Sequence, residues 1–160
     1  MLTDRDLAHL RRCVELAAEA LAAGDEPFGS VLVGADGTVL AEDRNRVAAG
    51  DATRHPEFAL ARWAAANLTP EQRAAATVYT SGEHCPMCAA AHAWVGLGPV
   101  VYASSSEQLT GWLADLGVPP PPVRTLPIPQ VAPGVDVRGP APELAERVHD
   151  LHRRLHGSRQ

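Results

Sequence analysis

Two short segments of the sequence most restrict how this chain can fold. Residues 54–57 read Arg-His-Pro-Glu and residues 85–88 read Cys-Pro-Met-Cys, and each stands at the start of a predicted helix. Side chains in the first turn of a helix lean toward its N-terminus, so they can converge on a point just beyond the helix end. A fold that uses both segments must therefore bring two helix N-termini together.

Hydrophobic periodicity and turn residues place the other elements around these segments. We predict helices at residues 3–23, 55–66, 85–94, 107–116 and 141–155, and strands at residues 28–33, 38–43, 77–80 and 99–103. A Gly-Ala-Asp-Gly turn at residues 34–37 predicts that the first two strands form a hairpin. The prolines and glycines of residues 123–142 allow at most one short strand. Strands and helices alternate from the middle of the chain onward, which is typical of an α/β fold with a layered sheet.

Length and composition suit one domain over residues 1–160, in which residues 119–160 form a proline-rich segment and a C-terminal helix. No apolar run approaches the roughly 18 residues of a membrane helix, and residues 1–12 carry charges where a signal peptide would be apolar. Three cysteines, two of them closely spaced, fit a reducing compartment. We therefore expect a cytoplasmic protein that makes no contact with membranes. The net charge of -5 also argues against nucleic acid as the main partner.

The two segments together predict a catalytic zinc site. His55, Cys85 and Cys88 are side chains that zinc prefers, and three protein ligands leave one tetrahedral position for water. Both the helix dipole and the cation favour thiolate over thiol at the two cysteines. Glu57 follows His55 by two residues and can reach that water without coordinating the metal. Its predicted role is to carry protons during the reaction.

Other uses of these cysteines remain open at this point. A Cys-x-x-Cys pair after a strand is also typical of redox proteins, but redox exchange has no use for His55 and Glu57 on a preceding helix. A structural zinc site needs a fourth ligand, for which His84 or His92 is available, and it would leave Glu57 without a purpose. A noncatalytic or redox zinc module is thus the alternative from a different functional class. Cys13 is predicted to be a small core residue.

The order of the motifs resembles that of the cytidine deaminase superfamily, whose signature is His-x-Glu followed by Cys-x-x-Cys. The resemblance spans residues 25–103 and includes residues 27–33, Asn45, residues 51–57 and residues 79–91, in the order seen in bacterial guanine deaminases and tRNA adenosine deaminases. It implies a three-layer α/β/α sandwich with a mixed five-stranded sheet. It also implies one zinc ion in each subunit of a homodimer whose active sites lie near the subunit interface.

The resemblance further implies which residues bind the substrate. Asn45 would hydrogen-bond the substrate, Phe28 and Gly29 would form a wall of the base pocket, and the backbone around Glu83 and Cys85 would contact the leaving amino group.

The chain departs from the family pattern at two positions. Pro56 stands between the histidine and the glutamate, where a small residue is usual, and proline is acceptable there because the first helical turn needs no N–H donor. His84 replaces the proline that normally precedes the first cysteine. It is a candidate substrate contact, and a solvent-facing position or an adjustment of the metal site are the alternatives.

The activity implied is hydrolytic deamination of a free nucleobase or similar aminated heterocycle, guanine-like first, to a carbonyl and ammonia. A tRNA adenosine deaminase would need a basic surface around the pocket, which the sequence does not supply near the motifs. Cytosine or cytidine remains an alternative, because the same chemistry serves pyrimidines and purines. The contacts that select the base often come from the C-terminal third, where residues 119–139 are too irregular to align.

Overall fold

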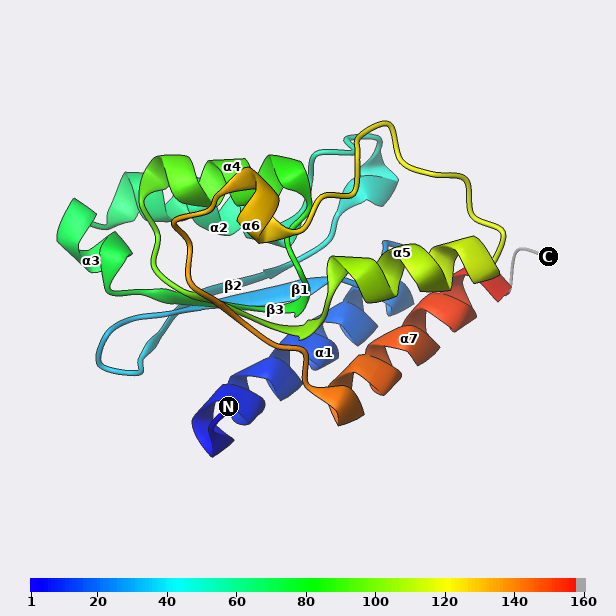
Figure 1. Cartoon of the computed structure of the whole chain (residues 1–160), viewed down its shortest axis with the longest axis horizontal. Helices are drawn as coiled ribbons and strands as arrows, with labels where there is room; N and C mark the ends of the chain where they lie inside the picture. The colour runs from blue at the N-terminus through cyan, green and yellow to red at the C-terminus, as the bar shows by residue number, and fades with distance from the viewer. Residues whose placement is uncertain (158–160) are drawn as a thin grey trace.

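A mixed five-stranded sheet forms the centre of the computed structural model, which describes residues 1–157 (Figure 1). Its strands are β1 (Gly29–Val33), β2 (Val39–Arg44), β3 (Thr77–Gly82), β4 (Val100–Ser104) and β5 (Val137–Arg138), in the spatial order β2-β1-β3-β4-β5. β1 runs antiparallel to both β2 and β3, whereas β3, β4 and β5 are parallel. The predicted hairpin of β1 and β2 and the mixed sheet are both confirmed.

Helices cover both faces of this sheet. They are α1 (Asp4–Ala22), α2 (Pro56–Asn67), α3 (Pro70–Ala74), α4 (Pro86–Val95), α5 (Ser106–Asp115), α6 (Ile128–Val131) and α7 (Pro142–Gly157), with a short 3-10 helix η1 (Val47–Ala49). In Figure 1, α1, α5 and α7 lie on one side of the sheet and α2, α3, α4 and α6 on the other. The three-layer α/β/α sandwich is thus confirmed. Of the helices within residues 1–157, none is long and apolar enough to cross a bilayer.

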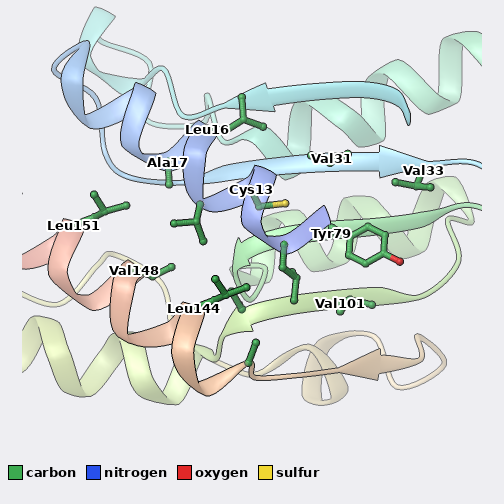
Figure 2. Packing of buried hydrophobic residues seen from close by; sticks show 14 residues of the cluster. Cys13, Leu16, Ala17, Val31, Val33, Tyr79, Val101, Leu144, Val148 and Leu151 are labelled. Atoms are coloured by element: carbon green, nitrogen blue, oxygen red, sulfur yellow. The ribbon is translucent and has the colours of Figure 1, made fainter. Parts of the chain in front are cut away.

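The layer formed by α1 and α7 packs on the sheet through alternate strand residues. α1 begins with a capping box, in which the Thr3 side chain accepts from the backbone of Asp6 and the Asp6 side chain accepts from the backbone of Thr3. Its apolar face then meets Val31, Tyr79 and Val101, while α7 contributes Leu144, Val148 and Leu151 to the same core (Figure 2). Cys13 is fully buried in this cluster, as predicted.

The opposite face of the sheet is apolar in the middle and polar at one end. Leu32 and Val78 pack under α2 with Leu60 and Ala64. Two positions before Leu32 and two after Val78, the same face carries Ser30 and Thr80, which are paired across β1 and β3. Because strand side chains alternate between faces, these two buried hydroxyls point toward the layer that holds α2 and α4.

Three short elements were not predicted from the sequence: η1, α3 and α6. η1 lies between the second predicted strand and the second predicted helix, and α6 lies within the proline-rich segment, where β5 is the one short strand that the composition allowed. The helix predicted at residues 141–155 is α7. The last three residues of the predicted segment 119–160 lie outside the described residues.

Candidate active site

The two motif segments meet at the N-termini of α2 and α4, which pack against each other. His55 is the N-cap residue of α2 and Cys85 is the N-cap residue of α4. In each helix proline occupies the first turn, where its fixed φ suits the helix and its missing N–H costs no hydrogen bond. The two helix starts therefore present ligand side chains at one point, as the sequence predicts.

The three ligand-type atoms form a nearly equilateral triangle. His55 Nδ1 lies 3.5 Å from Cys85 Sγ and 3.5 Å from Cys88 Sγ, and the two sulfur atoms are 3.5 Å apart. In tetrahedral zinc sites, bonds of about 2.3 Å to sulfur and 2.0 Å to nitrogen place the ligand atoms roughly 3.5–3.8 Å apart. The donor set and its spacing thus fit zinc, and the group is positioned to bind a metal.

The three ligand side chains shift one another's pKa values. The hydrogen bond between the two sulfur atoms lowers the pKa of Cys85 to about 4 and raises that of Cys88. The hydrogen bond to Cys85 raises the pKa of His55 to about 9, although burial opposes this shift. One sulfur is therefore already a thiolate at neutral pH, the state in which cysteine binds metals.

Glu57 lies beside the triangle, at the polar end of the sheet. Its side chain is 6% exposed, and burial raises its pKa. The Thr80 hydroxyl donates to Glu57 Oε1 at 2.9 Å, and the Ser30 hydroxyl lies 3.3 Å from the same atom. The hydroxyls of Ser30 and Thr80 thus contact the same carboxylate oxygen, Oε1. The sheet therefore fixes the orientation of the carboxyl group through one of its two oxygens.

Ser30 and Thr80 are the site residues that sequence reasoning missed. The sequence does contain a signal, because Ser30 is the one polar side chain of β1, and both residues alternate onto the face of Leu32 and Val78. Only the antiparallel pairing of β1 with β3 brings them together opposite α2.

Asn45 is fully buried just after β2, with its amide group held in one orientation. The backbone N–H groups of Glu26 and Val47 both donate to Asn45 Oδ1, at 3.3 and 3.1 Å. Its Nδ2 atom is buried and has no hydrogen-bond partner within residues 1–157. Because the oxygen is already bonded, the unused group of Asn45 is a donor.

The two other predicted pocket residues precede β1 and begin it. Phe28 packs edge-on against His152 of α7, with ring centroids 5.1 Å apart, and lies next to Gly82. Gly29 faces α1, because a Cβ atom there would lie 2.5 Å from the Cys13 carbonyl oxygen. Gly29 thus allows the close approach of helix and sheet, and its contribution to a pocket wall stays a prediction, as does that of Phe28.

The Glu83 and His84 side chains contact segments other than the ligand triangle. The Glu83 carboxylate accepts from the backbone N–H of Ser106, at 2.9 Å, and of Ile128, at 2.7 Å, which are the first residues of α5 and α6. The His84 ring is 1% exposed and packs edge-on against His92, with centroids 5.3 Å apart, so burial lowers its pKa well below the usual value. Substrate contacts by either residue stay predictions.

Known proteins resemble this chain in both sequence and fold. It is 34% identical over 122 residues to a probable cytosine deaminase of Schizosaccharomyces pombe, covering 75% of this chain and 73% of that protein. It is 41% identical over 97 residues to the guanine deaminase of Bacillus subtilis, covering 59% of this chain and 62% of that protein. A mutant of NE0047 in complex with 8-azaguanine has the same fold, with a TM-score of 0.73 at 23% identity over 98% of this chain and 86% of that one.

The model of the cytidine and deoxycytidylate deaminase zinc-binding region matches residues 3–104, which contain the ligand triangle and Glu57. Since the match covers more than half of the chain and the triangle has the spacing that zinc requires, the protein belongs to this family and is a zinc-dependent hydrolytic deaminase.

Proposed function

We propose that His55, Cys85 and Cys88 hold one zinc ion and that Glu57 carries the protons of the reaction. When bound, zinc supplies the Lewis acidity that makes a water molecule nucleophilic near neutral pH. The ligand spacing of 3.5 Å and the burial of Glu57 beside it support these roles. The family match supports the same assignment.

Glu57 then moves two protons in sequence. Its carboxylate takes a proton from the attacking water and passes it to a ring nitrogen of the substrate, while oxygen bonds to the adjacent ring carbon. It next transfers the second proton of that water to the amino group, which leaves as ammonia as the carbonyl forms. The Thr80 hydroxyl on Oε1 holds the carboxyl group throughout, so Oε2 is the atom that exchanges protons.

We propose a free aminated purine base, guanine first, as the substrate. The observation that carries this choice is the Asn45 amide, whose Nδ2 is buried without a partner among the described residues. An unpaired buried donor costs about 1–3 kcal/mol, which a carbonyl oxygen or ring nitrogen of a bound base would recover. Guanine offers such acceptors beside its amino group. The relative named guanine deaminase and the neighbour bound to 8-azaguanine support the same class.

Ammonia release from a panel of compounds tests the substrate. The panel contains guanine, adenine, cytosine, their nucleosides, a triazine analogue and a tRNA anticodon stem-loop. We expect guanine to react fastest. A reaction with the stem-loop alone would contradict a free-base substrate and leave the deaminase chemistry intact.

Changing Glu57 to Gln tests the proton carrier on the best substrate of this panel. The variant should keep about one zinc ion per chain and lose ammonia release by at least about a hundredfold, since general acid-base catalysis contributes roughly 10²–10⁴. Retained activity with bound zinc would contradict the role of Glu57.

Cytosine is the second candidate substrate. It is favoured by the S. pombe relative, which is named a probable cytosine deaminase and matches this chain over 75% of its length. The same panel separates the two bases, because cytosine lacks the second ring of guanine and should react slowly in a pocket shaped for a purine.

We further propose that the protein forms a homodimer through the layer of α2 and α4. Trp94 on α4 is 89% exposed, and Trp63, Ala91 and Val95 lie partly buried in the same layer. Apolar side chains that gather on one exposed surface mark interaction sites, and these four residues of one layer support such a site. Light scattering should give twice the chain mass for the wild type and the single mass for Trp94→Glu, whereas Val123→Glu, at another exposed apolar residue, should leave the dimer intact. A monomeric wild type would contradict this assembly.

A cytoplasmic location also stays a proposal. The three free thiols of Cys13, Cys85 and Cys88 support it, because free thiols persist in reducing compartments.

A further inference from the structure

The loop that carries Asn45 is tied to the end of α1 by an ion pair that the sequence motifs do not include. The Arg44 guanidinium donates to Asp25 Oδ2 at 2.7 Å, through the nitrogen Nη1. Both side chains are largely buried, with 21% of Arg44 and 10% of Asp25 exposed. Burial of this kind is unusual for charged side chains unless they are paired, and it indicates a structural role for this pair.

The two residues bond to the backbone of Asn45 and of the segment that follows it. The same Nη1 atom of Arg44 donates to the carbonyl oxygen of Asn45 at 3.0 Å. The other carboxylate oxygen of Asp25 accepts from the backbone N–H of Ala48 at 2.9 Å. These bonds, the Ala48 contact first, lower the pKa of Asp25, so the carboxylate stays charged at neutral pH.

Asp25 is itself fixed to a rigid element. Its backbone N–H donates to the carbonyl oxygen of Ala20 at 2.9 Å, in the last turn of α1. The Asn45 backbone N–H in turn donates to the Phe28 carbonyl oxygen at 3.0 Å. With Oδ1 also bonded, Nδ2 is the one polar atom of Asn45 left without a partner in the described structure.

We propose that Asp25 and Arg44 are positioning residues for substrate binding, which hold the Asn45 backbone so that its Nδ2 donor faces the bound base. This inference rests on the proposed function, in which Asn45 donates to the substrate. Neither residue touches the base. They act on substrate binding through their hydrogen bonds to the Asn45 carbonyl and the Ala48 N–H. Substituting them should therefore weaken binding only when the Asn45 side chain is present.

A double-mutant cycle tests this dependence with the best base of the panel as substrate. Asn45→Ala, Asp25→Ala and Arg44→Met are made singly, and each positioning variant is combined with Asn45→Ala. Arg44→Met and Asp25→Ala should each raise KM by about tenfold with kcat changed by less than about twofold, because they weaken binding rather than the proton transfers. In the Asn45→Ala background the same changes should raise KM no further.

A second ion pair on the same strand provides the matched control. Arg12 bonds to both carboxylate oxygens of Glu42, at 2.7 and 3.1 Å, and Glu42 lies two residues before Arg44 in β2. This pair joins β2 to α1 without contacting Asn45. Glu42→Gln should leave KM unchanged, and thermal unfolding and zinc content of every variant show whether it is folded. Asp25→Asn replaces Asp25→Ala if the latter does not fold.

The KM values of these variants distinguish a failure of the positioning role from a failure of the proposed substrate contact. If Asn45→Ala leaves KM unchanged, the proposed substrate contact is wrong and the inference falls with it. If Asn45→Ala raises KM but the folded Asp25 and Arg44 variants do not, the positioning role alone is wrong. Equal KM increases in the presence and absence of the Asn45 side chain would also overturn it.

Discussion

Two hydroxyls from neighbouring strands decide which oxygen of Glu57 is free to exchange protons. Ser30 Oγ donates to Thr80 Oγ1 at 2.9 Å, and Thr80 Oγ1 donates to Glu57 Oε1 at 2.9 Å. Thr80 Oγ1 also lies 2.9 Å from the Gly82 carbonyl oxygen, and Ser30 Oγ lies 3.3 Å from Glu57 Oε1, so the two hydroxyls and the carboxylate form one buried cluster. All three side chains are buried, where hydrogen bonds to charged groups are strong.

Thr80→Val therefore tests how much the hydrogen bond from Thr80 to Glu57 contributes to catalysis. Valine is similar in size to threonine but has no hydroxyl, so Glu57 loses the shorter of its two hydroxyl contacts and keeps the one from Ser30. We expect kcat to fall by about tenfold, with KM and zinc content little changed, since one charge-assisted hydrogen bond contributes about 1.5 kcal/mol or more. Ser30→Ala, which removes the longer contact of 3.3 Å to the same oxygen, serves as the comparison and should have a smaller effect. An unchanged kcat for Thr80→Val would contradict the anchoring role.

The residues of the site differ in how far they could be predicted. His55, Glu57, Cys85 and Cys88 lie in two local motifs, each within four positions of sequence, so their convergence depends only on two helix starts. The positions of Ser30 and Thr80, in contrast, depend on strand register between segments 50 residues apart. No local pattern encodes that register, which is why these contacts appear only in the folded chain.

At the level of elements, the contact between α1 and β1 permits no side chain at position 29. A Cβ atom on Gly29 would lie 2.4 Å from Leu16 Cβ and 2.8 Å from the Ala17 backbone nitrogen. Backbone atoms of a packed helix cannot move aside cheaply, so the helix and the sheet would have to separate. Every other contact in this layer depends on their spacing.

Gly29→Ala should lower the free energy of unfolding by about 3 kcal/mol, the upper end of the usual cost of overpacking. Urea unfolding followed by circular dichroism measures this change. Gly111→Ala is the matched control, because a Cβ atom on this helical glycine of α5 meets nothing within 4 Å. It should raise stability by up to about 1 kcal/mol through helix propensity. Equal stability of the two variants would contradict the proposed clash.

Glu83 connects three elements, because it precedes α4 and binds the first N–H groups of α5 and α6. A carboxylate at a helix start satisfies an N–H that has no partner within the helix. Glu83→Gln keeps the size of the side chain but replaces one acceptor oxygen with a donor. We expect hydrogen exchange at Ser106 or Ile128 to accelerate by about tenfold, as one lost hydrogen bond of about 1.4 kcal/mol would give.

The control for Glu83 is Glu107→Gln, which removes an exposed charge from the first turn of α5 without removing an acceptor from Ile128. Its exchange rates at Ser106 and Ile128 should stay within about twofold of the wild type, because exposed charges near a helix start contribute little. Equal acceleration in both variants would show that charge, rather than the two hydrogen bonds, holds these segments.

The sequence predicts long helices and strands, whose apolar residues repeat over several turns or alternations, but it does not predict the short helices. α1 extends over 19 residues with a capped start and an apolar face, so its bounds match the prediction within one residue. α6 has four residues, proline occupies its N-cap position (Pro127) and an internal position (Pro129), and the N-cap residue itself makes no capping hydrogen bond. One helical turn is too short to show a repeating hydrophobic pattern. Its first N–H is bound by Glu83, which is distant in sequence.

Across the whole molecule, Asp6 joins the first turn of α1 to the middle strand β3 and the edge strand β5 of the sheet. Its carboxylate accepts from the Tyr79 hydroxyl of β3 at 2.7 Å, from Arg138 of β5 at 2.6 Å and from the Thr3 backbone at 2.9 Å. Tyr79 and Arg138 lie 73 and 132 residues away along the chain. The edge strand β5 has only two residues, so this ion pair is a substantial part of what fixes it.

The protonation of Asp6 should therefore be visible in the acid stability of the protein. Burial would raise the pKa of Asp6, but the hydrogen bonds from Thr3, Arg138 and Tyr79 outweigh it and lower the pKa to about 2. Since the folded value lies below the unfolded value of 3.8, the contribution is complete above pH 4 and is lost as the pH falls toward 2. The difference corresponds to about 2 kcal/mol.

Asp6→Asn isolates this contribution from that of all other carboxylates. The variant should be less stable than the wild type at pH 7 by about 2 kcal/mol, because asparagine offers one acceptor where the carboxylate offers two and carries no charge for Arg138. The stability difference between the two proteins should shrink between pH 4 and pH 2, where the wild type takes up the proton, and urea unfolding at a series of pH values measures it. A difference that stays constant over this range would mean that the two proteins bind protons alike, and that Asp6 contributes through shape and not through charge.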